Sequence, residues 1–171
     1  MQEPLQLQLK NLLSGTGRTV SAAESCTGGN ISHMITTVSG SSEYYLGSVT
    51  SYAVEVKNKV LGVPFDTVEK SGIVSSDVAV AMAEGVRNLT GSTYSVATTG
   101  WAGESGDEHE PAGTVWVAVA GPSGTISGKF QTKATRVTTI RRFTTFALRK
   151  LVDFISKDLQ DCESNNITNS L

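Results

Sequence analysis

The chain has 171 residues, a formal net charge of −2, 39% hydrophobic residues and 18% charged residues. This length favours one domain with a sizeable core. The nearly balanced charge gives no support for a nucleic-acid or anionic-membrane partner, and no run of 18 apolar residues is present to cross a bilayer.

The cysteines and the N-terminus narrow the class of protein further. Cys26 and Cys162 are the two cysteines, too few for a disulfide framework, and neither belongs to a CxxC metal motif. Met1-Gln2-Glu3-Pro4 lacks the basic and apolar regions of a secretory signal. We therefore expect a cytoplasmic protein without a metal.

Helical and extended patterns alternate along the chain. Leucines at helical spacing predict the first helix, whereas β-branched and aromatic runs predict the strands. In the first half the predicted elements are a helix over 5–13, a strand over 19–22, a helix over 28–36, a strand over 44–52, a helix over 53–61, a short helical piece from Pro64 and a helix from the Ser75-Ser76-Asp77 cap to about Leu89.

The second half contains a hairpin between longer elements. It is predicted to hold a strand over 94–100, a loop over 101–111, a doubly buried strand over 113–120, a turn over 121–124, an alternating strand over 125–132 and a helix over 137–154. Residues 157–171 are polar and are expected to form a disordered tail. The order predicts an α/β fold over 1–156: a single-domain three-layer α/β/α sandwich with a mixed, mostly parallel sheet of about five strands.

The segment Ala22 to Gly29 lies where the first predicted strand passes into a helix, with Ser25 at the bend and two glycines after it. In open α/β sheets ligands bind at such crevices, and N–H groups at a helix start can hold a phosphate or an oxyanion. A serine- and threonine-rich helix cap packed against small residues would explain the same segment without any ligand.

A serine hydroxyl needs a base to become a nucleophile. His33 lies about two turns beyond Ser25 in the predicted helix, and neither it nor His109 forms a recognisable triad. The residues on either side of His109 are glutamates, but adjacent residues do not share a face, so a solvated loop is favoured over a metal site.

A lysine with a lowered pKa is the remaining candidate base. Lys57 follows Tyr52 by five residues at a predicted strand-to-helix junction, and apolar surroundings would weaken its hold on its proton. A solvated helix lysine is the plain alternative, and Lys59 competes for the same role.

Several separated motifs, in the same order, resemble the CinA C-terminal family. The resemblance covers about Leu5 to Ile155, and the combination is more specific than any one motif. The motifs are Ala23-Glu24-Ser25-Cys26-Thr27-Gly28-Gly29, Gly40-Ser41-Ser42, Tyr52 with Lys57 and Leu61-Gly62-Val63, Thr99-Gly100-Trp101-Ala102-Gly103, Pro111-Ala112-Gly113-Thr114-Val115, and Arg136.

The family looks like nicotinamide mononucleotide deamidases. The resemblance implies an amidohydrolase that converts this mononucleotide to nicotinic acid mononucleotide and ammonia, without metal or organic cofactor. It implies Ser25 as nucleophile, Lys57 as base and the Tyr52 hydroxyl as their assistant, with oxyanion-stabilising N–H groups near residues 25–29. The implied substrate-binding residues are Cys26, Thr27, Gly28, Gly29, Thr99, Gly100, Ala102, Gly103, Arg136, a guanidinium suited to phosphate, and Arg141.

The resemblance also implies partners and organisation. We expect a small-molecule substrate, no nucleic-acid or membrane partner, and a homo-oligomer. Many members of the family carry a second, N-terminal domain that resembles molybdenum-cofactor enzymes, so this chain looks like the stand-alone form.

Three departures from the family pattern leave alternatives open. Val54 replaces a usual asparagine, the loop after Gly103 carries Glu104 and Asp107, and Arg141-Arg142 is offset from the usual register. One alternative is a related serine–lysine amidase or esterase for another small nucleotide or amide. Another is a non-catalytic nucleotide- or partner-binding module with the same fold.

Overall fold

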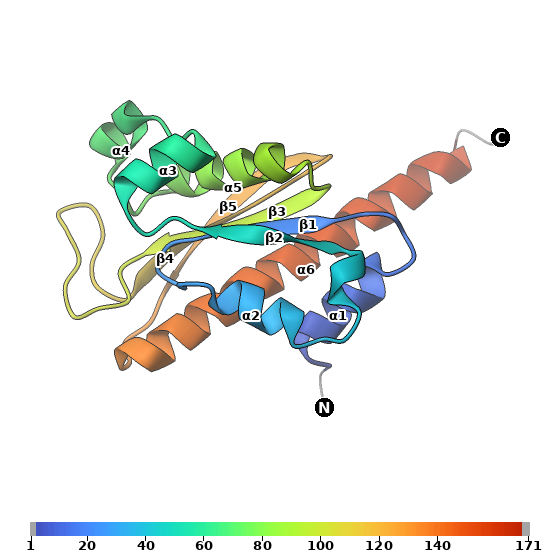
Figure 1. Cartoon of the computed structure of the whole chain (residues 1–171), viewed down its shortest axis with the longest axis horizontal. Coiled ribbons are helices and arrows are strands. Elements are labelled where there is room, and N and C mark those ends of the chain that lie inside the picture. The colour runs from blue at the N-terminus through green and yellow to red at the C-terminus, as the bar shows by residue number, and fades with distance from the viewer. Residues whose placement is uncertain (1–2, 169–171) are drawn as a thin grey trace.

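A single five-stranded sheet forms the centre of the protein, with helices on both faces (Figure 1). The computed structural model describes residues 3–168, with side-chain burial given for residues 3–164. The sheet has the order β2-β1-β3-β4-β5. Its strands are β1 (Val20–Glu24), β2 (Tyr45–Thr50), β3 (Tyr94–Gly100), β4 (Thr114–Gly121) and β5 (Gly124–Gln131).

The sheet is mixed because only its last connection is a local hairpin. β1 pairs in parallel with both β2 and β3, whereas β4 runs antiparallel to both β3 and β5. Parallel neighbours need a crossover through another layer, which the helices between β1, β2 and β3 supply. Four strands therefore run in the same direction and β4 runs against them.

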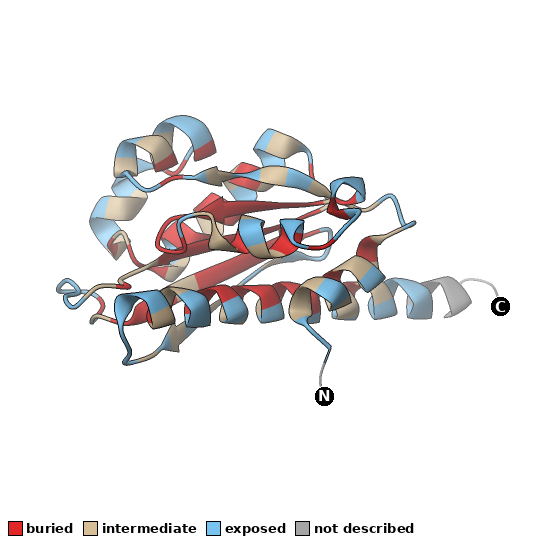
Figure 2. Cartoon of the chain, turned by 60° about the horizontal axis from the view of Figure 1, so that its bottom comes forward, coloured by how far each residue is buried: buried red, intermediate tan, exposed pale blue. Residues whose placement is uncertain are grey.

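The helices form the two outer layers of the predicted three-layer sandwich, as Figures 1 and 2 show. One layer contains α1 (Leu5–Leu13), α2 (Asn30–Thr36) and α6 (Arg136–Thr168), and the other contains α3 (Val54–Leu61), α4 (Phe65–Ser71) and α5 (Ser76–Thr90). The short 3-10 helix η1 (Ser41–Glu43) lies between α2 and β2. Within residues 3–168 no helix is long and apolar enough to span a bilayer.

The two layers pack on the sheet with different side chains. The α6 side is built from large residues such as Phe143 and Leu151, whereas the α5 side relies on small ones such as Ala79 and Ala83. A Cβ on Gly85 of α5 would lie 2.0 Å from the main-chain oxygen of Leu61, so a larger residue would push α3 away. Small residues thus let α3 and α5 lie close together on the face that carries the candidate base.

The C-terminal end of the last helix was predicted wrongly. The sequence places it near Phe154, but α6 continues to Thr168. The polar composition of the C-terminal segment predicted that the helix ends before it. However, no glycine or proline interrupts residues 155–168, and this segment still contacts the core. The Tyr94 hydroxyl donates to buried Asp158 at 2.7 Å, and Leu159 packs on the α6-side core. The predicted tail beyond residue 168 lies outside the described residues.

Candidate functional site

Ser25 lies immediately after β1, between the carboxyl ends of β2 and β3. Its N–H donates to the Thr98 oxygen of β3 at 3.1 Å, and the Glu24 oxygen accepts from the Ser51 N–H after β2 at 2.8 Å. The neighbouring strands therefore fix the bend on both sides. This is the edge at which open α/β sheets bind ligands, and the Ser25 side chain is nearly buried there.

Lys57 reaches Ser25 from the first half of α3. Its Nζ donates to Ser25 Oγ at 2.9 Å, to the Ser51 oxygen at 2.6 Å and to the Tyr52 oxygen at 3.4 Å. The residue is 0% exposed, and the ion pairs formed by the described residues do not include it. Burial without a carboxylate partner lowers the Lys57 pKa to about 8.

The geometry distinguishes the two lysines that the sequence left in competition. Lys57 is fully buried against Ser25, so it is not the solvated helix lysine of the plain alternative, whereas Lys59 is exposed. His33 is also exposed, on the solvent side of α2. A base for Ser25 is therefore available from Lys57 and not from these two residues.

Glu24 carries a structural role that the sequence analysis missed. Its buried carboxylate accepts hydrogen bonds from the Thr27 and Ser32 hydroxyls and from the N–H groups of Gly29, Ile31 and Ser32, at 2.7 to 3.0 Å. An acidic residue close to a helix start is the available signal, because carboxylates stabilise the N–H groups of a first helical turn. Glu24 thereby fixes α2 against the bend that presents Ser25.

These contacts narrow the set of N–H groups near residues 25–29 that are expected to act as oxyanion donors. The N–H groups of Ser25, Gly28 and Gly29 are already bonded, to Thr98, Ser25 and Glu24 respectively. Among the described residues, the N–H groups of Cys26 and Thr27 donate to no main-chain oxygen. The donors left for an oxyanion near Ser25 are therefore those two.

A cavity of about 240 Å³ opens beside Ser25 and brings together most of the predicted site residues. The expected residues that line it are Ser25, Cys26, Tyr52, Thr99, Gly100, Ala102, Gly103 and Arg136. Four other expected residues, Thr27, Gly28, Gly29 and Arg141, line a neighbouring hollow of about 410 Å³ instead. Ile73, Val74, Trp101 and Ser105 complete the cavity wall and were not predicted.

The Tyr52 hydroxyl points to a different partner from the one expected. It accepts from Arg136 Nη2 at 2.9 Å, and no hydrogen bond joins it to Ser25 or Lys57 within the described part of the chain. The side chain is 61% exposed, so it stands at the cavity mouth. Tyr52 contacts Lys57 Nζ only through its main-chain oxygen.

Two further expected residues have structural partners. The Thr99 hydroxyl donates to the Ile73 oxygen at 2.7 Å, which ties the end of β3 to the segment before α5. Cys26 is buried, and its burial raises the thiol pKa to about 12. The thiol is therefore protonated near neutral pH.

The loop over 101–111 covers one side of the cavity and is fixed at its far end. Asp107 Oδ1 accepts from the N–H groups of His109 and Glu110, while the Glu110 carboxylate accepts from Trp116 at 2.8 Å and from Lys129 at 3.2 Å. Within the described residues no group of three His, Cys, Asp or Glu side chains is placed to hold a metal. Glu110 serves to anchor this loop on β4 and β5.

Comparison with known proteins places the chain in a known family of domains. Residues 2–155 match the family model described as the CinA C-terminal domain. A CinA-like protein of Flavobacterium psychrophilum is 42% identical over 158 residues, covering 92% of this chain and 37% of the relative, and one of Salinibacter ruber is 50% identical over 120 residues, covering 70% and 29%. The chain thus spans about a third of the length of these curated relatives.

Solved structures match over nearly the whole of both chains. The competence damage-inducible protein A of Klebsiella pneumoniae superposes with a TM-score of 0.85 at 28% identity, covering 89% of this chain and 95% of that one. A competence/damage-inducible protein of Agrobacterium tumefaciens gives 0.83 at 30% identity, covering 87% and 92%.

Proposed function

The chain belongs to the family of CinA C-terminal domains, and from that premise we propose that it is an amidohydrolase with Ser25 as nucleophile and Lys57 as base. The observation that carries the proposal is the 2.9 Å contact between Lys57 Nζ and Ser25 Oγ, with the amine fully buried. The proposed substrate, by resemblance to the family, is nicotinamide mononucleotide, and the products are nicotinic acid mononucleotide and ammonia.

The first half of the reaction forms an acyl-enzyme. Neutral Lys57 takes the proton of the Ser25 hydroxyl as the oxygen attacks the carboxamide carbon. The N–H groups of Cys26 and Thr27 stabilise the negative charge on the carbonyl oxygen, an effect of about 3–4 kcal/mol for such a donor. The C–N bond then breaks, and the nitrogen leaves as ammonia with the proton carried by Lys57.

The second half restores the enzyme. Lys57, neutral again, takes a proton from a water molecule that attacks the acyl carbon, and returns it to Ser25 Oγ as the ester bond breaks. With a pKa of about 8, roughly one tenth of Lys57 is neutral at pH 7 and about half at pH 8. Burial therefore makes an ordinary lysine into a usable base near neutral pH.

Ammonia release from nicotinamide mononucleotide tests this proposal directly. We expect Ser25→Ala to lower the turnover number by at least about 10³-fold, because among the described residues the Ser25 hydroxyl is the one to which Lys57 Nζ is hydrogen-bonded. Ser123→Ala, which removes an exposed hydroxyl from the β4–β5 turn, is the matched control and should retain turnover. Full turnover by Ser25→Ala would show that the assignment of the nucleophile is wrong.

A second candidate is the same chemistry on another small amide or ester. The observation that favours it is the exposed Glu104 in the loop after Gly103, which places a carboxylate close to the cavity mouth. Such a charge disfavours an anionic substrate on that side. Comparing ammonia release from the mononucleotide, free nicotinamide and unrelated amides distinguishes the two candidates, because only the first requires the nucleotide to be the preferred substrate.

A further inference from the structure

The bend that carries Ser25 is a tight turn. The Gly28 N–H donates to the Ser25 main-chain oxygen at 3.1 Å, so Cys26 and Thr27 are the two central residues of a turn over 25–28. The N–H groups of these central residues donate to no main-chain oxygen, and they are the oxyanion donors of the proposed reaction. The direction in which they point therefore depends on the contacts that hold the turn against the sheet.

Thr98 of β3 holds this turn at two points. Its main-chain oxygen accepts from the Ser25 N–H at 3.1 Å, and its hydroxyl lies 2.8 Å from the Thr27 hydroxyl. Thr98 is the register partner of Glu24 across the two parallel strands, and it is 0% exposed. One buried residue of the neighbouring strand therefore binds both the first and the third residue of the turn.

The buried hydroxyls form a chain of hydrogen bonds with one direction. The Thr27 hydroxyl donates its single proton to the Glu24 carboxylate at 2.7 Å, because a carboxylate only accepts. The Thr98 hydroxyl therefore donates to the Thr27 hydroxyl. Without the Thr98 hydroxyl, the Thr27 side chain would keep its bond to Glu24 and lose its bond to β3, so the turn would be joined to β3 at one point instead of two.

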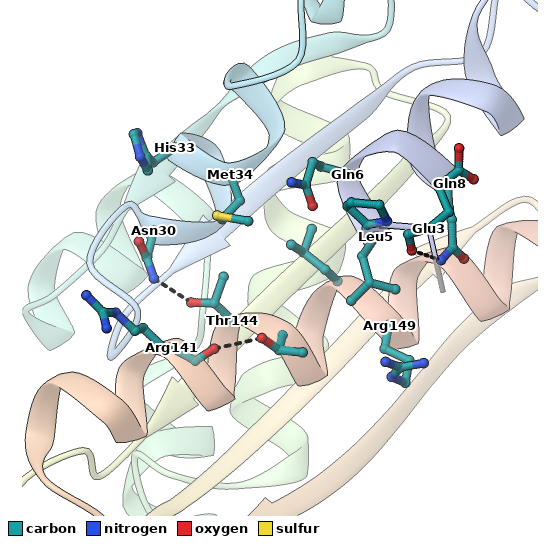
Figure 3. A pocket seen from close by; sticks show the side chains of 13 residues that line it. Glu3, Leu5, Gln6, Gln8, Asn30, His33, Met34, Arg141, Thr144 and Arg149 are labelled. Carbon is teal, nitrogen blue, oxygen red and sulfur yellow. Dashed lines mark hydrogen bonds between the residues drawn. The ribbon is translucent and has the colours of Figure 1, made fainter. Parts of the chain in front are cut away.

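A second buried threonine anchors the start of α2 from a different direction. Thr144 of α6 is 3% exposed, and its hydroxyl accepts from the Asn30 amide at 3.0 Å, as Figure 3 shows. The Thr144 hydroxyl donates its own proton to the Ile140 main-chain oxygen at 2.9 Å. Thr98 and Thr144 thus carry similarly buried hydroxyls beside the same bend, but of these two only Thr98 bonds to residues 25–27.

We infer that Thr98 is a positioning residue for the reaction of Ser25; this inference rests on the proposed function. Thr98 holds the turn so that the Ser25 hydroxyl and the two oxyanion donors face the substrate carbonyl together. The cavity beside Ser25 is lined by Thr99 and not by Thr98, so Thr98 acts through the turn and not by contact with the substrate. Its contribution therefore belongs to kcat and not to KM.

Thr98→Val tests this role, because valine keeps the shape of threonine and removes the hydroxyl. We expect kcat for ammonia release to fall about 10- to 100-fold, since small displacements of catalytic groups cost factors of this size, and KM to change by less than about threefold. Thr98→Ala also lacks the hydroxyl and should show the same loss, whereas Thr98→Ser retains it and should stay within about threefold of wild type. Wild-type kcat in Thr98→Val, or no rescue by serine, would overturn the inference.

Thr144→Val is the matched control, because it also removes one buried hydroxyl that anchors this region. Urea unfolding should show a similar loss of stability in Thr144→Val and Thr98→Val, while kcat of Thr144→Val stays within about threefold of wild type. An equal fall of kcat in the two variants would show that any lost packing beside the bend lowers turnover, and it would overturn the positioning role.

A fluorophosphonate probe separates this inference from the proposed function, because it reacts with an activated serine without any amide substrate. Ser25 Oγ forms a bond to phosphorus as the P–F bond breaks, its proton passes to Lys57, and fluoride leaves. Mass spectrometry should locate the label on Ser25, with a labelling rate about 10- to 100-fold lower in Thr98→Val and unchanged in Thr144→Val.

The two assays together give distinct outcomes. If the wild-type protein is labelled in this pattern but releases no ammonia, the proposed function fails and the positioning role stands. If ammonia is released and Thr98→Val is labelled as fast as wild type, the function stands and the role of Thr98 is wrong.

Discussion

Two buried charged groups flank Ser25, and the protein treats them in opposite ways. The Glu24 carboxylate accepts five hydrogen bonds, two from hydroxyls and three from N–H groups. Lys57 Nζ contacts only the Ser25 hydroxyl and main-chain oxygens, with no ion-pair partner among the described residues. A buried charged group with a full set of hydrogen-bond partners stabilises the structure around it, whereas a buried charged group without a counter-ion readily changes its protonation state.

The difference between the two groups predicts their roles. Glu24 joins β1 to α2 and keeps the bend at Ser25 in one shape. Lys57 Nζ donates a hydrogen bond to the Ser51 main-chain oxygen and another to the Ser25 hydroxyl. The pKa of Lys57 is lowered to about 8. The first residue should matter mainly for stability and the second mainly for chemistry, and the following predictions test that division.

Among the variants that test this division, Lys57→Met should have the largest effect, and that effect is on activity. Removing the base should lower the turnover number by about 10²- to 10⁴-fold, because the Ser25 hydroxyl then has no proton acceptor. Ammonia release measures the loss, and Lys59→Met, which changes the exposed lysine on the same helix, is the control. Comparable turnover in both variants would remove Lys57 from the mechanism.

The same substitution should make the protein more stable. The difference between the ordinary lysine pKa of 10.5 and a pKa of about 8 corresponds to a cost of up to about 3 kcal/mol for burying the charged amine. Below pH 8 both the folded and the unfolded chain bind this proton, so the whole cost is present. Between about pH 8 and 10.5 the unfolded chain alone binds it, so wild-type stability rises with pH and the advantage of Lys57→Met disappears. Urea unfolding of the wild-type protein and of Lys57→Met at pH 7 and pH 10 measures the rise in wild-type stability and the loss of the variant's advantage.

Glu24→Gln should lower the stability of the protein, whereas Lys57→Met should raise it. The amide places an NH₂ group among five donors and leaves some of them buried without an acceptor, so we expect a loss of about 2–4 kcal/mol in the free energy of unfolding. Urea unfolding measures it, with Glu69→Gln on the exposed face of α4 as the control. Equal stability of the two variants would show that the Glu24 contacts contribute little.

The pH profile of the wild-type reaction tests the protonation of Lys57. In the proposed mechanism the neutral amine is the base, so kcat/KM should rise about tenfold for each pH unit below about 8 and level off above it. Stopped ammonia assays between pH 6 and 9.5 measure the profile. A rate that falls as the pH rises through 8 would mean that the protonated amine is the active form.

The sequence predicts the positions of the candidate pair, Ser25 and Lys57, better than it predicts their surroundings. Ser25 follows a strand and Lys57 lies in the first half of a helix, both of which local patterns indicate, and the family resemblance implies the pairing. The contacts of Glu24 span only three to eight residues, and an acidic residue close to a helix start is their local signal. The direction of the Tyr52 hydroxyl, in contrast, depends on Arg136, 84 residues later in the chain. Long-range contacts of this kind become visible only in the folded chain.

Replacing Cys26 should have the smallest effect on turnover, and its thiol can be compared with the other buried titratable group, Lys57. Burial raises its thiol pKa to about 12, while it lowers the Lys57 pKa to about 8, because in each case the low-dielectric interior disfavours the charged form. The same physical cause therefore makes the amine reactive and the adjacent thiol inert.

Cys26→Ala should accordingly keep turnover within about threefold of wild type, because a protonated thiol takes no part as nucleophile. Iodoacetamide at pH 8, followed by mass spectrometry, should modify exposed Cys162 and leave buried Cys26 intact, with no loss of ammonia release. Inactivation that follows the alkylation of Cys26 would show that Cys26, and not Ser25, is the nucleophile. Resistance of Cys26, together with inactive Ser25→Ala, would leave the hydroxyl as the nucleophile that Lys57 serves.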